Sequence, residues 1–315
     1  TSIAQLIQPE DSQHSPCTEG CLYLTLYHDG FPMDACISPM GEGEIFVIED
    51  TAASPELKAY ALASSQLRQP LSTVITLVNQ LEGAMENSQD PKVQSRALAL
   101  KHQLWKMHRM LCNMSDAKFY TETTSDRRVC QNASGVVEEI FQKAQDLLQR
   151  QGITLEYHVP CETVLCMLDE QLLERAIYNM ISNAVKFSGS KTGLKAELKR
   201  NDNRLSLSIT EPCDSVNAEI PANIFRQYTR EPGIETGAAG IGLGMSIVCS
   251  AARAHKGTVL LDHPSKNETR ITLSFPIDLG QDTKVASGVS GFDYAGGWDR
   301  GLLELADILP SDFYA

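Results

Sequence analysis

Long apolar runs and basic residues are both scarce in this sequence of 315 residues. No run of about 18 apolar residues occurs, so no segment has the composition of a membrane-spanning helix. The chain has 27 lysines and arginines against 40 aspartates and glutamates, which gives a formal net charge of −13. Nucleic-acid binding needs clustered basic residues to neutralise phosphates, so this balance argues against a nucleic-acid partner and favours protein partners.

Cysteines suited to disulfides or metal sites are also lacking. The nine cysteines are odd in number and scattered through apolar segments, as reduced core thiols are, which predicts a cytoplasmic protein. Cys17 and Cys21 have the spacing of half a metal site, but no second Cys/His pair lies nearby, so we expect no zinc. The first residues lack a basic and apolar leader, so we expect membrane attachment only through a region outside this chain.

Two short apolar runs alternate with polar residues near the start, from Leu22 to Tyr27 and from Ile45 to Ile48. Turn-forming residues around Gly30 and Gly43 separate them, which predicts a small antiparallel sheet. With the sequence Val-Ile-Glu-Asp at its end, the segment 1–53 resembles the second half of a PAS sensor domain that feeds a signalling helix.

From residue 54 the apolar spacing changes to alternating fours and threes, the pattern of a helix packed against another helix. Residues 87–91 form a turn that ends in proline, and the same spacing resumes after it. The apolar positions are Leu67, Leu71, Val74, Val78, Leu81 and Met85, then Val93, Ala97, Leu100, Leu104, Met107, Leu111 and Met114. We expect a helical hairpin over 54–120, paired in a homodimer as a four-helix bundle, because one hairpin cannot cover both stripes. A monomeric bundle docked on the chain's own second domain is the alternative.

The part that begins near residue 135 mixes helical and strand patterns. Helices are expected at 135–150, 169–187 and 244–255, and strands at 153–158, 194–199, 204–210, 257–262 and 269–275. Helices on one face of a mixed sheet make an α+β sandwich.

Two groups of residues in this part suit phosphate and metal binding. Gly240, Gly242 and Gly244 form a glycine-rich string before a predicted helix, where backbone amides and the helix N-terminus can approach phosphate closely. Asn179 and Asn183 are four residues apart, so both carboxamides lie on one helix face. The alternative for the glycine string is a tight loop before a helix, and the alternative for the two asparagines is an ordinary solvated helix face.

These strings resemble the second glycine box and the asparagine box of the GHKL ATPases, and residues 55–277 together resemble the sensor histidine kinases. The resemblance implies an α/β sandwich of the GHKL (Bergerat) ATPase type over 128–278, with ATP and Mg²⁺ as possible ligands. It implies that Asn183 ligates Mg²⁺ through oxygen and that Lys186 lies near the phosphates, with Asn179 in the same box.

Two further strings of the resemblance concern the nucleotide. Residues 225–230 resemble the family's phenylalanine box in the mobile lid, which makes Arg230 a candidate nucleotide-binding residue; a short lid helix without nucleotide contact is the alternative. Where the family has Asp-x-Gly-x-Gly for adenine, this sequence has Glu211 followed by Pro-Cys-Asp-Ser. The longer acid and the added side chains lower the shape complementarity to adenine. A missing or misplaced contact to the base weakens the binding free energy by roughly 1 to 3 kcal/mol, or about one to two orders of magnitude in affinity. We therefore expect ATP binding to be weak or absent.

The family's phosphoacceptor motif His-Glu-Leu-Arg-Thr-Pro-Leu corresponds to residues 65–71, where Ser65 replaces the histidine and Gln66 its neighbouring base. Phosphorylating an imidazole needs a ring nitrogen and a general base, and neither is present. The leading hypothesis is a signalling pseudokinase of a two-component system that dimerises and binds a response regulator or an active histidine kinase. The alternatives are a phosphatase that uses Gln66 and Gln69 on a partner's aspartyl phosphate, and a kinase with residual ATP binding.

The last segment, 279–315, is expected to hold a linker rich in Gly, Ser and Asp and then an amphipathic tail helix that Pro310 ends. The helical spacing comes from Trp298, Leu302, Leu305 and Leu309. We expect this helix to dock either on the chain's own core or in an apolar groove of a partner or of the nucleotide domain. On the second hairpin helix, His102 and His108 are expected to be surface or packing residues.

Overall fold

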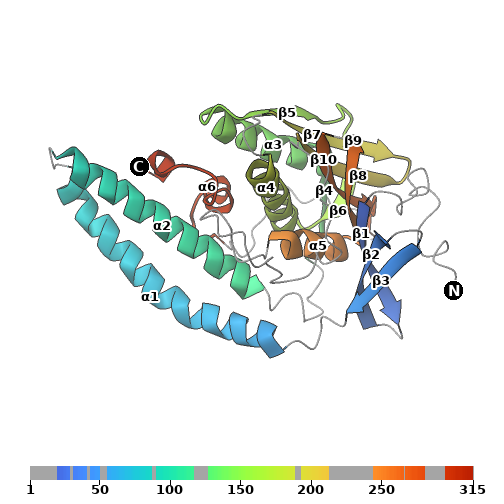
Figure 1. Cartoon of the computed structure of the whole chain (residues 1–315), viewed down its shortest axis with the longest axis horizontal. Helices are drawn as coiled ribbons and strands as arrows, with labels where there is room; N and C mark the ends of the chain where they lie inside the picture. Colours follow the sequence, from blue (N-terminus) through green and yellow to red (C-terminus); the bar gives the residue numbers. More distant parts are fainter. Residues whose placement is uncertain are drawn as a thin grey trace.

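The protein consists of a long helical hairpin and an α/β sandwich, with the C-terminal segment lying between them (Figure 1). The computed structural model describes residues 20–28, 31–40, 43–49, 55–86, 90–116, 127–188, 193–212, 244–265, 267–280 and 295–314. Within this part of the chain, no helix is long and apolar enough to cross a membrane.

The hairpin is formed by α1 (Pro55–Glu86) and α2 (Pro91–Asp116). Proline suits the first position of a helix because the amide it lacks has no partner there. Asp90 precedes α2 and its carboxylate accepts a hydrogen bond from the Lys92 amide at 2.9 Å, which caps the helix. Four residues of the predicted stripes are buried between the two helices: Leu71, Val78, Leu104 and Leu111.

An eight-stranded mixed sheet forms the sandwich, in the order β3-β2-β1-β9-β10-β8-β7-β5, and β4 and β6 form a separate pair. All pairs are antiparallel except β5 with β7. The first five strands are β1 (Gly20–His28), β2 (Phe31–Met40), β3 (Gly43–Glu49), β4 (Val129–Asn132) and β5 (Thr154–His158). The others are β6 (Leu165–Leu168), β7 (Gly193–Asn201), β8 (Arg204–Pro212), β9 (Thr258–Ser265) and β10 (Glu268–Pro276).

The first three strands differ from the expectation of a separate small sheet. They are antiparallel, as predicted, but β1 pairs with β9, so they extend the main sheet. The pairing covers the backbone edge that β9 would otherwise expose. Tyr23 on β1 donates a hydrogen bond to Asp34 on β2 at 2.7 Å, and Asp34 also pairs with Arg253 of the sandwich. The resemblance of residues 1–53 to a PAS domain stays a prediction.

Three helices pack against the sheet: α3 (Ala133–Gln149), α4 (Glu170–Phe187) and α5 (Gly244–Ala254). Their apolar faces and the inward residues of the strands form one core. Asp169 caps α4 by accepting a hydrogen bond from the Leu172 amide at 3.0 Å. The predicted α+β sandwich is therefore confirmed, although the sequence pattern did not indicate β4 and β6.

The C-terminal segment, residues 295–314, is less helical than its spacing predicts. It contains α6 (Arg300–Glu304), then turns, and then the 3₁₀ helix η4 (Ser311–Tyr314). The carbonyl oxygens of Ala306 and Ile308 bond to the side chains of His102 on α2 and of Gln151 in the turn after α3. Tertiary contacts therefore replace the helix beyond Glu304. We call residues 295–314 the tail.

Candidate functional site

The asparagines of α4 lie close to the N-terminus of α5. A Cβ atom added to Gly244 would lie 3.0 Å from Asn179 Oδ1 and 3.7 Å from Asn183 Oδ1. A side chain at position 244 would crowd these carboxamides, so glycine suits the close approach of the α5 backbone. The structure thus brings together three of the residues that the sequence assigns to one site, and their role as nucleotide ligands stays a prediction.

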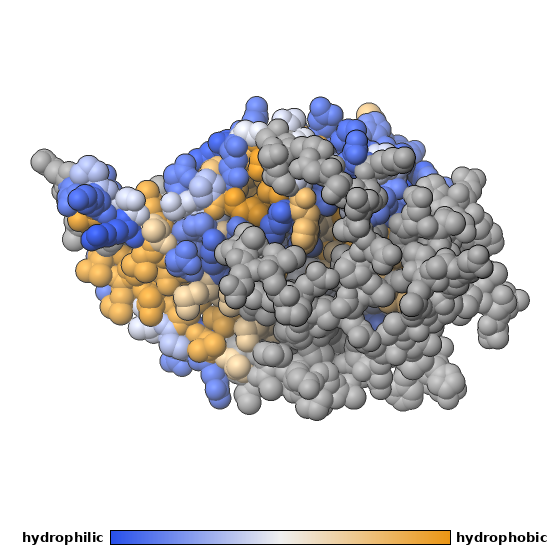
Figure 2. All heavy atoms as spheres, in the orientation of Figure 1, coloured by the Kyte–Doolittle hydropathy of each residue, from blue (hydrophilic) through white to orange (hydrophobic). Residues whose placement is uncertain are grey.

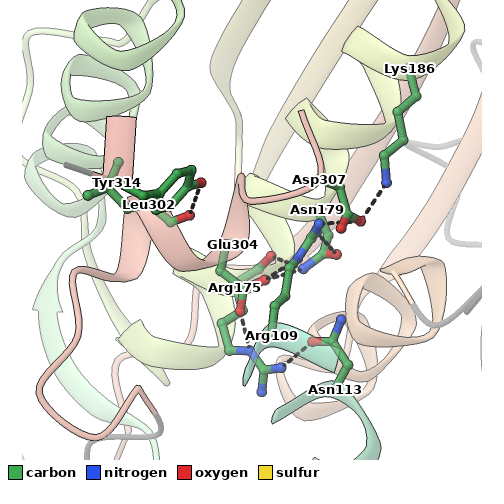
Figure 3. Close-up of polar contacts among 9 residues, drawn as sticks. All are labelled: Arg109, Asn113, Arg175, Asn179, Lys186, Leu302, Glu304, Asp307 and Tyr314. Carbon is green, nitrogen blue, oxygen red and sulfur yellow. Dashed lines mark hydrogen bonds and ion pairs between the residues drawn. The ribbon is translucent and has the colours of Figure 1, made fainter. Parts of the chain in front are cut away.

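Asn179 is 1% exposed, and both polar atoms of its side chain are engaged (Figure 3). Nδ2 donates to the Arg175 carbonyl at 2.8 Å and to Glu304 Oε2 at 3.2 Å. Oδ1 accepts a hydrogen bond from Arg109 Nη2 at 3.1 Å. Arg109 belongs to α2 and Glu304 to α6, so this asparagine joins the sandwich, the hairpin and the tail.

Glu304 is fully buried, and its carboxylate lies between two arginines (Figure 3). Arg175 Nε donates to Glu304 Oε1 at 2.9 Å, and Arg109 Nε lies 3.5 Å from Glu304 Oε2. Arg175 also donates to Asn113 Oδ1 on α2 at 2.9 Å. A buried carboxylate is strongly destabilising unless it is paired, so these contacts account for an acid in the core.

Asp307, one turn further along the tail, contacts two more nitrogens. Its Oδ2 lies 2.8 Å from Lys186 Nζ and 2.6 Å from Arg109 Nη1. Burial acts to raise the pKa of Asp307, but the charges of Arg109 and Lys186 outweigh burial and hold it below its ordinary value. Lys186, expected near phosphate, is thus paired with a carboxylate of the same chain.

Aromatic residues hold the tail against α2. His102 stacks on Tyr314 with ring centroids 4.8 Å apart, and Trp105 meets Trp298 edge to face at 4.3 Å. His108 stacks on Trp298, also at 4.8 Å. Burial lowers the pKa of both histidines. They are packing residues of the tail contact.

Glu211 on β8 stands where the family has its adenine-binding aspartate. This side chain is 8% exposed, and its Oε2 has no hydrogen-bond partner in the part of the chain that the structure describes. Burial raises the pKa of Glu211 to about 8. Other predicted nucleotide contacts lie outside the described residues: Gly240, Gly242, Arg230 and the phenylalanine-box segment.

Residues 65–71, which resemble the family's phosphoacceptor motif, lie on α1, on the far side of α2 from α4 (Figure 1). The side chains of Gln66 and Gln69 are exposed. The backbone of Ser65 is helical, and its side chain lies outside the described part. Polar groups that act on a docked partner need this kind of exposure.

An apolar surface covers part of the hairpin, where Figure 2 shows hydrophobic residues gathered. We call it the exposed apolar stripe. It consists of Leu67, Val74, Leu77, Leu81, Leu100, Met107 and Met110. A continuous surface of this kind is typical of a protein interface.

No group of three or more His, Cys, Asp or Glu residues in the described ranges could hold a metal ion. Cys21, one of the two cysteines considered as half of a metal site, is a buried residue of β1 whose Sγ lies 2.9 Å from Cys36 Sγ. Cys17 lies outside the described residues.

Sequence reasoning missed Arg109, Arg175, Glu304 and Asp307 as members of this site. The acidic character of the tail was visible in the sequence. Its pairing with arginines on α2 and α4 was not, because no local pattern links residues more than 100 positions apart.

Comparisons with known proteins agree with this fold. Residues 168–279 match the family model of histidine kinase-, DNA gyrase B- and HSP90-like ATPases. The chain is 20% identical to "Histidine kinase P4" of Formosa agariphila over 239 residues, 74% of this chain and 17% of that protein. It is 23% identical to the adaptive-response sensory kinase SasA of Gloeothece citriformis over 230 residues, 69% of this chain and 56% of that protein.

A solved structure, full-length ShkA in complex with AMPPNP, superimposes with a TM-score of 0.56 at 20% identity and covers 71% of this chain and 46% of that one. The chain thus spans between about a sixth and somewhat more than half of the length of these relatives. The similarity to ShkA shows a shared fold.

Proposed function

We propose that this chain, a member of the sensor histidine kinase family, is a two-component signalling protein that acts by dimerising and by binding a response regulator or an active histidine kinase. It does so without phosphorylating its own hairpin. One observation carries the proposal: helix α1 has Ser65 and Gln66 where the family has its phosphoacceptor and base. A serine hydroxyl beside an amide offers neither an imidazole nitrogen nor a proton acceptor.

Nucleotide binding is retained in weakened form under this proposal. Asn183 would supply an oxygen ligand to Mg²⁺, and Asn179 and Lys186 would face the phosphates. Two observations support this part of the proposal: the close approach of Gly244 to the asparagines, and the buried Glu211 carboxyl, whose Oε2 has no hydrogen-bond partner among the described residues. We expect a dissociation constant for ATP of roughly 1 mM or weaker, because Glu211 and its neighbours replace the family's adenine contacts.

Restoring the acceptor chemistry tests the proposal. In the variant Ser65→His with Gln66→Glu, we expect acid-labile phosphate to appear on the hairpin at high ATP and Mg²⁺ concentrations, while the original chain acquires none. Phosphate on the original chain would contradict the proposal. If this variant stays unphosphorylated, the defect lies in the nucleotide site around Glu211.

A second candidate function is supported by the exposure of Gln66 and Gln69 on α1. An exposed amide can orient water toward the aspartyl phosphate of a docked response regulator. If the chain is such a phosphatase, Gln66→Ala and Gln69→Ala should each slow the loss of that phosphate at least tenfold. Gln80→Ala, which removes another exposed glutamine of the same helix, is the control. Equal rates for all variants would leave binding as the function.

A further inference from the structure

Three cations converge where the asparagine face of α4 meets α2. Arg175 and Lys186 come from α4, and Arg109 comes from α2 (Figure 3). Among the described residues, the carboxylates of Glu304 and Asp307 face them. Guanidinium and ammonium groups also bind phosphate, so the acidic side chains of the tail occupy a place whose donors suit other anions.

We propose that the tail is a displaceable occupant of a polyphosphate-binding site, in which Glu304 and Asp307 hold the positions that the phosphates of a nucleoside triphosphate take when the tail leaves. The inference rests on the proposed nucleotide site at α4. It adds to that site two arginines, Arg109 and Arg175, and an internal competitor. Carboxylate and phosphate oxygens are bound by the same guanidinium donors, so exchange of one for the other keeps the chemistry of the site.

The tail fills the site incompletely. Arg109 is 4% exposed, and its Nε and Nη1 make no hydrogen bond with any described residue. Both nitrogens lie within ion-pair distance of tail carboxylates, at 3.5 Å from Glu304 and 2.6 Å from Asp307. The tail thus neutralises the charge of Arg109 but leaves these two donors without hydrogen bonds. A phosphate group has more acceptor oxygens than a carboxylate and suits such a set of donors better.

Polyphosphate and the tail exclude each other. Asn179 Oδ1 accepts a hydrogen bond from Arg109, and Nδ2 donates to Glu304 and to a backbone carbonyl of its own helix. Lys186 Nζ is paired with Asp307. An incoming anion reaches these groups only after the carboxylates withdraw. Because the tail also bridges α2 and α4, its withdrawal loosens the hairpin from the sandwich. Ligand binding and hairpin release are therefore coupled, and each favours the other to the same extent.

The chain has a built-in reporter of this exchange. It contains two tryptophans, and both lie in the contact between α2 and the tail. The rings of Trp105 and Trp298 are 4.3 Å apart. Withdrawal of the tail exposes both rings to water, so the intrinsic tryptophan emission shifts to longer wavelength.

The experiment titrates the full chain with inorganic tripolyphosphate and, separately, with ATP and Mg²⁺, at constant ionic strength. Binding is followed by calorimetry and the tail by tryptophan emission. We expect tripolyphosphate to shift the emission of the original chain, and sodium chloride at matched ionic strength to leave it unchanged. In the variant Glu304→Gln with Asp307→Asn, the emission should be shifted before any ligand is added, and the ligands should bind at least tenfold more tightly. Asp312→Asn removes an exposed tail carboxylate and should behave like the original chain.

The outcomes separate this inference from the proposed nucleotide site. Displacement by tripolyphosphate but not by ATP supports the inference and shows that the adenine contacts are lost. Binding of ATP without an emission shift, and with equal affinity in the double variant, overturns the inference and leaves the nucleotide site in place. If neither ligand changes the emission or produces heat with either protein, the tail is a permanent part of the fold and the inference is wrong.

Discussion

Glu211, the acidic residue of the expected adenine site, lies in an environment that the sequence pattern did not indicate. The motif predicted an acid at this position, and the structure buries it on β8 with Oε2 unpaired among the described residues. Its pKa is raised from about 4.5 to about 8 by burial. In the unfolded chain this carboxyl loses its proton near pH 4.5, whereas in the folded chain it keeps the proton until about pH 8. The contribution of Glu211 to stability is therefore largest below pH 4.5 and is lost as the pH rises toward 8.

Replacing Glu211 by glutamine tests this environment. The variant Glu211→Gln should have a higher free energy of unfolding than the original chain at pH 8, by up to a few kcal/mol, because each unit of pKa shift corresponds to about 1.4 kcal/mol. The difference should shrink toward pH 5. Urea denaturation at several pH values measures it, with the exposed Glu156→Gln as control. Equal pH profiles for Glu211→Gln and the original chain would show that Glu211 is solvated.

At the scale of helices and strands, the hairpin divides its apolar residues into two sets. Leu104 and three other residues are buried within one hairpin, whereas the exposed apolar stripe includes Leu77 at 53% and Leu81 at 57% exposure. We expect the stripe to be covered by a second copy of the chain, since pairing two hairpins completes a four-helix bundle. The replacement Leu104→Glu would therefore disrupt the hairpin itself.

A charge on the exposed apolar stripe tests dimerisation without disturbing the fold of the single chain. The variant Leu77→Glu should convert the dimer to a monomer at micromolar concentration while the helical circular dichroism stays unchanged, because more than half of Leu77 is exposed within one chain. Asn79→Glu adds the same charge at an exposed polar position of α1 and should remain dimeric. Light scattering gives the masses. A monomeric original chain would contradict the expected dimer.

The tail docks through a close contact that a single glycine permits. A Cβ atom at Gly301 would lie 3.0 Å from the Tyr178 hydroxyl and 3.1 Å from Leu147 Cδ1. Gly301→Val should therefore weaken docking by roughly 1 to 3 kcal/mol and shift the tryptophan emission to longer wavelength. Gly193→Ala has open space around it and is the control. Unchanged emission in Gly301→Val would mean that α4 yields to accommodate the side chain.

The sequence predicted those elements whose signal is local. The change from alternating to helical spacing near residue 54 indicated the hairpin, and the apolar periods after residue 135 indicated the main helices and most strands. The missed features depend on distant partners: β1 joins β9, and β4 pairs with β6. The tail helix ends early for the same reason, since its carbonyl groups bond to the side chains of His102 on α2 and of Gln151 in the turn after α3.

The candidate site was predictable to a similar extent. Asn179, Asn183 and Gly244 were indicated by their spacing and lie together, as expected. The arginine and carboxylate cluster around Asn179 could not be foreseen, because it forms only when α2, α4 and α6 come together in space. In the whole molecule, the tail therefore connects the hairpin to the domain that matches the ATPase family model.

The central claim is that this chain signals by binding without taking up phosphate. The most direct measurement is the transfer of the terminal phosphate of labelled ATP to this chain with Mg²⁺, quenched in alkali, where phosphohistidine survives, and in acid, where it does not. We predict no incorporation under either quench, even at millimolar ATP, because Ser65 and Gln66 cannot support the transfer. Stoichiometric incorporation that is lost in acid would contradict the account, since it would reveal a working phosphoacceptor histidine elsewhere in the chain.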